Sequence, residues 1–160
     1  MDHHVALRVR DIEASARFWT EALGGALATP IALRTGGYFD DLFGAGAQVK
    51  ICYVTFDAGA VELFEFVRPR VDVPVSQQTV DGLMHFGVTV ADVPAALEKV
   101  EALGGKRRLP VNHVGGRPDA PRFVYCEDPD GHVFELMEMT VEQTVTEIHK
   151  NIAQMEKEIR

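Results

Sequence analysis

The chain repeats itself, and this duplication constrains the fold more than any other feature of its 160 residues. Residues 2–25 and 83–105 each hold a histidine, a short alternating stretch, an aspartate and a closing EALGG. A second echo follows, because VELFEF at 61–66 returns as FELMEM at 134–139. An internal repeat of this kind indicates two equivalent structural units.

Hydrophobic periodicity predicts the same order of elements in both halves. In the first half, the alternation after His4 predicts a strand, and Asp11 is placed to cap a helix that ends at Gly24 and Gly25. A weaker strand and two clear strands follow, joined by a tight turn. The second half repeats this order, with a Gly- and Pro-rich loop at 110–121. We therefore predict an α+β fold of two tandem βαβββ modules.

The boundaries of these units follow from prolines and from a change of pattern near the C-terminus. We expect the first module at 1–67, a linker at 68–82, the second module at 83–140 and an amphipathic helix at 141–160. The apolar seam of this helix must be buried against its own domain or against a second copy. We favour the second copy, and so expect a homodimer.

Composition and charge narrow the partners. A formal net charge of −8 with no basic run argues against nucleic acid. No apolar stretch is long enough to span a membrane, and no secretory pattern is present, so we expect a cytoplasmic protein that acts on a small molecule. Cys52 and Cys126 are expected as buried thiols, with a disulfide as the alternative.

Four polar residues recur at matching positions of the repeat and point to a metal ion. Strand alternation places Glu62 and Glu135 on the sheet face that carries His4 and His85. A carboxylate on an apolar strand is costly to bury unless a cation compensates it. Two imidazoles and two carboxylates suit one divalent ion, which we expect to be Zn, Ni, Co, Mn or Fe. His3 stands beside His4, so the choice between them depends on strand register.

The segments HVALRVRDIEASARFW, GAVELFEF, HFGVTVADV and DPDGHVFELME, within residues 2–139, resemble the vicinal oxygen chelate superfamily. This superfamily includes glyoxalases, methylmalonyl-CoA epimerases, extradiol dioxygenases and antibiotic resistance proteins. The resemblance implies sheets that curl around a metal cavity, with ligands from the first and last strand of each module. Carried onto this chain, the metal ligands are His4, Glu62, His85 and Glu135.

The filled set of two histidines and two glutamates is most similar to that of glyoxalases and epimerases. We therefore expect a metal-dependent isomerase or epimerase that moves a proton next to a carbonyl of a small hydroxy-carbonyl or acyl substrate. Glu135 and Glu62 are the candidates for general base and acid. The alternatives are a glyoxalase-type lyase, an Fe(II) extradiol-type dioxygenase and a non-catalytic protein that sequesters its ligand.

Four further residues are candidates for substrate binding. Arg8 shares the face of His4 and is suited to an anionic group, although an ion pair with an acidic neighbour is the alternative. Phe64 and Met137 would form an apolar wall, or plain core. His113 lies with Arg117 in the Gly-rich loop, where both would close over a ligand or remain solvated loop residues.

Overall fold

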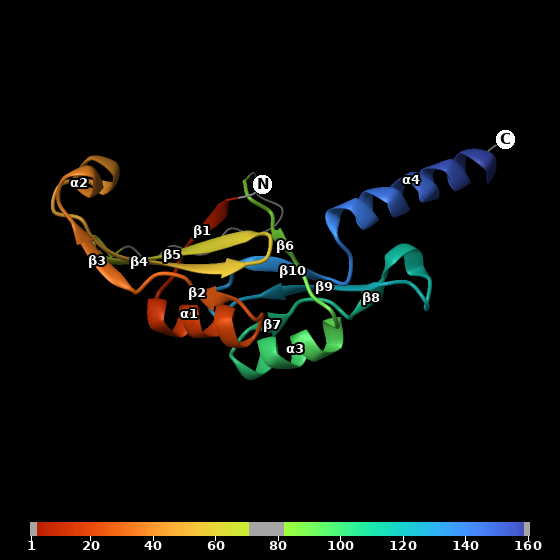
Figure 1. The fold of residues 1–160 in the computed structure, drawn as a ribbon, viewed down its shortest axis with the longest axis horizontal. Coiled ribbons are helices and arrows are strands. Elements are labelled where there is room, and N and C mark those ends of the chain that lie inside the picture. The colour runs from red at the N-terminus through yellow and green to blue at the C-terminus, as the bar shows by residue number, and fades with distance from the viewer. Residues whose placement is uncertain (1–2, 71–81, 159–160) are drawn as a thin grey trace.

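Two five-stranded mixed sheets form the body of the protein, with two helices on one side of them (Figure 1). This computed structural model describes residues 3–70 and 82–158, so most of the predicted linker at 68–82 lies outside the described residues. Both sheets are curled and open, and each belongs to one half of the repeat. The prediction of two tandem βαβββ modules is confirmed.

The first sheet has the order β1-β5-β4-β2, and β3 also pairs with β4. Strands β1 and β5 run parallel, whereas β4 is antiparallel to β2, β3 and β5. Strands β2 and β3 pair with the same edge of β4, and so act as one interrupted strand. The elements are β1 (His4–Arg8), α1 (Ile12–Glu21), β2 (Ala26–Leu27), β3 (Ala32–Thr35), α2 (Tyr38–Phe43), β4 (Gln48–Phe56) and β5 (Gly59–Arg68).

The second sheet repeats this topology as β6-β10-β9-β7, with β8 also paired to β9. A short strand, β8, and a single-turn helix, η1, form within the stretch at 110–121 that was predicted as a Gly- and Pro-rich loop. The last helix, α4, follows the second module and extends away from the sheets (Figure 1). The elements are β6 (Phe86–Thr89), α3 (Val93–Ala102), β7 (Lys106–Arg107), β8 (Asn112–His113), η1 (Val114–Gly116), β9 (Arg122–Glu127), β10 (Val133–Met137) and α4 (Val141–Glu158).

The repeated sequence motifs have the same structural role in both modules. Asp11 and Asp92 each cap a helix, accepting hydrogen bonds of 2.9 and 2.8 Å from the N–H three residues later. The second glycine of EALGG lies where the chain passes close to a strand. A Cβ atom on Gly25 would lie 2.5 Å from Val54, and one on Gly105 would lie 2.8 Å from the carbonyl oxygen of Glu127. Both positions therefore require glycine for packing.

The two modules share one hydrophobic core. Phe18 and Trp19 of α1 are fully buried, and both contact Phe134 of β10 in the other module. The Trp19 ring also lies 5.7 Å from that of Phe86 in β6. Contacts of this kind bury large apolar areas, so neither module keeps its core covered without the other.

Both cysteines are buried free thiols, as expected. Burial raises the pKa of Cys52 to about 11 and that of Cys126 to about 12. In the described part of α4, Val141, Val145, Ile148 and Ile152 are exposed, so the described residues of this chain leave this part of the seam uncovered. The homodimer remains a prediction. Among the residues described, no helix combines the length and the apolar character that crossing a membrane requires.

Candidate metal site

Each module brings one predicted histidine to one predicted glutamate. In the first module, the Nε2 atom of His4 lies 3.1 Å from the Oε2 atom of Glu62. In the second, the Nε2 atom of His85 lies 3.8 Å from the Oε2 atom of Glu135. The carboxylates are nearly buried, with 12% and 13% of their side chains exposed, whereas the imidazoles are 30% and 25% exposed. The structure thus contains two His–Glu pairs related by the repeat.

Strand alternation explains why these side chains share a face. Val61 and Leu63 on one side of β5 are buried in the shared core, as are Phe134 and Leu136 of β10. Glu62 and Glu135, the intervening residues, therefore project from the opposite face. The parallel register of β1 with β5 sets Ala6 opposite Glu62, so His4 lies one pleat away on the same face. The predicted orientation of the glutamates is confirmed.

A tyrosine accompanies each His–Glu pair, which the sequence analysis did not anticipate. Tyr53 lies directly opposite Glu62 on β4, and Tyr125 lies directly opposite Glu135 on β9. Burial and a hydrogen bond with Glu62 raise the pKa of Tyr53 to about 12. Burial, followed by the charge of Glu135 and a hydrogen bond with it, likewise raises the pKa of Tyr125. Each carboxylate thus has a phenol as its neighbour.

The His–Glu distances fit two donors on one ion. Ligand atoms about 2.1 Å from an ion, at angles of about 90–130°, lie about 3.0–3.8 Å from each other. The His85–Glu135 separation of 3.8 Å is too long for a hydrogen bond. Among the described residues, the buried Nδ1 atom of His85 has no hydrogen-bond partner. The Nε2 atom, which faces Glu135 without a hydrogen bond, is the nitrogen available to a cation.

The carboxyl group of Glu135 has a pKa above the ordinary value for glutamate. Burial raises the pKa of this carboxyl, and the opposing effects of His85 and of a hydrogen bond from Tyr125 only partly offset it. A carboxylate with a raised pKa is a stronger base than a solvated one. Glu135 is therefore suited either to binding a divalent cation or to accepting a proton.

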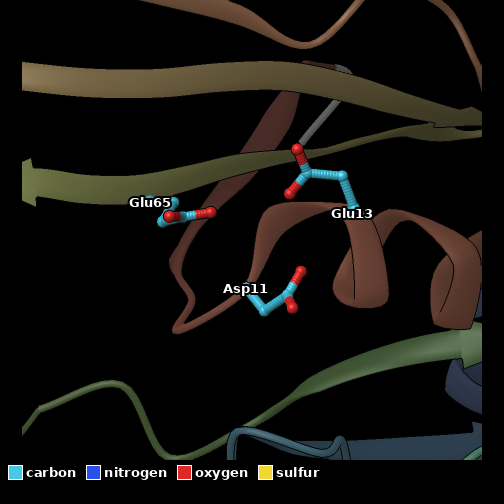
Figure 2. Close-up of side chains that lie close together, drawn as sticks. All are labelled: Asp11, Glu13 and Glu65. Carbon is cyan, nitrogen blue, oxygen red and sulfur yellow. The ribbon is translucent and has the colours of Figure 1, made fainter.

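The four predicted ligands remain two separate pairs within the described residues of one chain. There, the only group of three acidic or imidazole side chains with ligand atoms within 4.8 Å of one another consists of Asp11, Glu13 and Glu65. Figure 2 shows this group at the start of α1, beside β5. Binding of a single ion by His4, Glu62, His85 and Glu135 thus stays a prediction.

The negative charge of the acidic group in Figure 2 is already partly offset by a lysine side chain. The Nζ atom of Lys50 lies 3.2 Å from Glu65 and 3.4 Å from Glu13, and Glu65 also accepts the backbone N–H of Ile12. This arrangement recurs in the second module, where Glu138 accepts the N–H of Val93 and lies 2.6 Å from Arg122. Because both modules use it to join a helix N-terminus to a strand, we interpret the group as a structural clamp.

The candidate substrate residues differ in their surroundings. Arg8 is exposed, at the end of β1. Phe64 is partly buried, and Phe43 of α2 packs against both Phe64 and Phe66. Met137 contacts Thr144 at the start of α4 through its sulfur. None of these contacts tests the predicted role in substrate binding.

The Gly-rich loop is held by contacts of its own. The Nδ1 atom of His113 lies 2.7 Å from the carbonyl oxygen of Ala120, which joins the two ends of the loop. Arg117 forms an ion pair of 3.2 Å with Glu147 of α4. Their partners in this structure are thus protein groups, and closure of the loop over a ligand remains a prediction.

A polar junction between the modules also escaped the sequence analysis. In the DPDGH turn, Asp128 is buried and accepts a 2.8 Å hydrogen bond from His132. Burial lowers the pKa of His132, but hydrogen bonds with Asp128 and with the backbone of Arg8 contribute to raising it overall. Arg10 of the first module bonds Asp130 at 2.7 Å. A shallow pocket beside this junction is lined by Leu7, Leu83, Met84, His85, Phe86, His132 and Val133.

Comparison with known families gives a match over nearly the whole chain. Residues 3–136 match the model of the Glyoxalase/Bleomycin resistance protein/Dioxygenase superfamily. The chain is 31% identical over 137 residues to a protein named probable lactoylglutathione lyase, chloroplastic, from Arabidopsis thaliana. That match covers 84% of this chain but only 35% of the plant protein. It is also 31% identical over 143 residues to a 2-epi-5-epi-valiolone epimerase from Actinomyces sp, covering 86% of this chain and 78% of the epimerase.

Solved structures agree with the fold. A glyoxalase family protein from Bacillus cereus superposes with a TM-score of 0.74 at 19% identity, over 86% of this chain and 91% of that protein. Glyoxalase I from Zea mays superposes with a TM-score of 0.60 at 24% identity, over 86% of this chain and 44% of the maize protein. At these identities, the structural likeness concerns the fold alone.

Proposed function

The chain belongs to the Glyoxalase/Bleomycin resistance protein/Dioxygenase superfamily, and on this basis we propose that it is a metal-dependent epimerase of a small hydroxy ketone. The observation that carries the proposal is the pair of His–Glu contacts, His4–Glu62 and His85–Glu135, at matching positions of the two modules. Their nearly buried carboxylates need a cation, and their distances suit one.

The proposed roles follow from the chemistry of these donors. His4, Glu62, His85 and Glu135 would hold a divalent ion of the Zn, Ni, Co, Mn or Fe type. When bound, such an ion supplies positive charge that favours a negatively charged oxygen on the substrate. Of the two carboxylates, one takes the proton from the carbon beside the carbonyl and the other returns it to the opposite side. Glu62 and Glu135 thus serve as the acid–base pair.

The Actinomyces relative favours an epimerase over the other members of the family. The chain covers 78% of that epimerase, but only 35% of the plant protein named as a lactoylglutathione lyase. We therefore propose 2-epi-5-epi-valiolone and related hydroxy ketones as the first substrates to test. Lysis of lactoylglutathione is the second candidate, because the plant relative has the same 31% identity.

Solvent exchange at carbon tests this proposal directly. The purified protein, its metal content measured by elemental analysis, is incubated in D₂O with hydroxy ketones, lactoylglutathione and a catechol. We expect deuterium to enter a hydroxy ketone beside its carbonyl, and Glu135→Gln to abolish this exchange while it retains metal. Oxygen uptake with the catechol would instead indicate a dioxygenase. Ligand binding unaffected by metal removal would indicate sequestration.

In the described part of this chain, the two His–Glu pairs lie too far apart for a single ion to bind to both. We propose that the protein is a homodimer in which the His4–Glu62 pair of one copy faces the His85–Glu135 pair of the other. Within the described residues of one chain, no three of these residues bring their ligand atoms within 4.8 Å of one another, which supports this arrangement. The partner copy would also cover the exposed seam of α4.

Mixing two inactive variants distinguishes a shared site from one within a single chain. Glu62→Ala and Glu135→Ala are each expected to be inactive. In a mixed dimer, one of the two shared sites combines an intact Glu62 with an intact Glu135. Refolding the variants together would then restore activity, at up to about half the wild-type value for each mixed dimer. If both pairs serve one site within a single chain, the mixture stays inactive.

A further inference from the structure

The tyrosines at the two His–Glu pairs have matching surroundings. Tyr53 is opposite Glu62 in the register of β4 with β5, and Tyr125 is opposite Glu135 in the register of β9 with β10. Directly opposed residues project from the same sheet face, with Cβ atoms about 4.5–5.5 Å apart. Strand register therefore fixes each phenol beside its carboxylate.

Each tyrosine also contacts the histidine of its pair. The ring centroids of Tyr53 and His4 lie 5.5 Å apart with planes at 89°. Those of Tyr125 and His85 lie 4.9 Å apart with planes at 90°. Each edge-to-face contact limits the rotation of one imidazole ring. In each module, one tyrosine thus lies beside both the histidine and the glutamate of the pair.

The third tyrosine of the chain has different surroundings. Tyr38 lies on α2, is 70% exposed, and its ring contacts Phe39. Only the two tyrosines on the sheets have a His–Glu pair beside them. The recurrence follows the donors, because Tyr53 and Tyr125 are 72 residues apart, close to the 73 that separate Glu62 and Glu135.

We propose that Tyr53 and Tyr125 are positioning residues for the metal ligands, an inference that rests on the proposed metal site. The hydroxyl of each tyrosine holds one carboxylate oxygen, leaving the other directed at the ion, and the ring holds the imidazole. Groups that orient metal ligands in this way typically contribute about 10–100-fold to metal affinity.

The test removes only the hydroxyl groups. Metal-free wild type, Tyr53→Phe, Tyr125→Phe and the control Tyr38→Phe are titrated with Co²⁺, by calorimetry and by the visible absorption of the bound ion. Tyr53→Phe and Tyr125→Phe are expected to bind Co²⁺ about 10–100-fold more weakly, and Tyr38→Phe to bind as wild type does. Circular dichroism and thermal unfolding of the metal-free proteins check that the fold is unchanged.

A double variant shows whether Tyr53 acts through Glu62. Tyr53→Phe should weaken binding little further in the Glu62→Gln background, because the carboxylate that it positions is already gone. Wild-type affinity in both single Phe variants would overturn the inference and leave the proposed function intact. A wild-type protein that binds no Co²⁺ would overturn both. Equal losses in the two backgrounds would show that the tyrosine acts independently of the carboxylate, and would also overturn it.

Discussion

Replacing Glu138 with Gln tests the clamp that joins α3 to the end of β10, where Glu138 directly follows Met137. The Glu138 carboxylate accepts hydrogen bonds of 2.8 Å from Val93 N–H and 2.9 Å from Arg122 N–H. It also forms an ion pair of 2.6 Å with the Arg122 guanidinium. Desolvation raises the pKa of Glu138, but these bonds outweigh it and lower the pKa to about 2. The folded state therefore favours the charged carboxylate.

The magnitude follows from linkage between ionisation and folding. A fall from an ordinary pKa of 4.5 to about 2 corresponds to about 3 kcal/mol of stability, at about 1.36 kcal/mol per pKa unit. Because the folded pKa is depressed, this stabilisation is present above the unfolded pKa and is lost as the pH falls towards the folded one. About 2 kcal/mol should be lost between about pH 5 and pH 3. Glu138→Gln should thus destabilise the protein by about 2–3 kcal/mol at neutral pH.

Urea unfolding followed by circular dichroism at about pH 7, 5 and 3 measures this difference. Other carboxyl groups titrate in the same range, so the free energy of unfolding of the variant is subtracted from that of wild type at each pH. The exposed Glu142 provides a matched control, and Glu142→Gln should change stability by less than about 0.5 kcal/mol. A difference for Glu138→Gln that stays constant from pH 7 to pH 3 would refute the reasoning.

Three further predictions concern packing, metal and thiols. Gly105→Ala should lower the free energy of unfolding by about 1–3 kcal/mol, because the new Cβ would lie 2.8 Å from the backbone oxygen of Glu127. Urea unfolding measures this, and Gly87→Ala is the control because the space around its Cβ is open. Removing metal with EDTA should lower the thermal midpoint, by the equivalent of about 3–4 kcal/mol if the ion was at 100–1,000 times its Kd, and an unchanged midpoint would contradict metal binding. Cys52 and Cys126 should react with a disulfide reagent at about pH 8 only after unfolding, because both are buried; rapid reaction in the native protein would contradict this.

The duplication made the architecture predictable because repeated local signals agree with each other. Alternation in the strands correctly separated Leu63 and Leu136, which are buried, from Glu62 and Glu135, which face the other side. The helix caps at Asp11 and Asp92 were also predicted from neighbouring residues alone, and the structure confirms both. Short-range periodicity carries this information because each residue's face depends only on its own strand.

The tyrosines were not predicted because periodicity within one strand does not give its register with the next. Strand pairing sets Tyr53 opposite Glu62 and Tyr125 opposite Glu135. A spacing of 72 residues brings Lys50 onto Arg122 and Tyr53 onto Tyr125. A slip of two residues preserves every face, so alternation alone could not fix this register.

Long-range packing was beyond local reasoning for a different reason. The contacts of Phe18 with Phe134 and of Arg10 with Asp130 join residues more than a hundred positions apart. Periodicity along the chain does not show which residues from distant parts of the sequence come into contact. It also does not show how far apart the two His–Glu pairs lie in space. How one module lies against the other depends on the shapes of the packed side chains, which the sequence pattern does not encode.

The burial of Trp19 between α1 and the second module gives the protein an intrinsic optical reporter. It is the only tryptophan in the chain, and its ring packs against Phe86 and Phe134 of the second module. Its fluorescence emission therefore shifts when the two halves part, even if each keeps its secondary structure. Emission that changes at lower urea than the circular dichroism signal would reveal an undocked intermediate, and coincident transitions would show that docking and folding are one event.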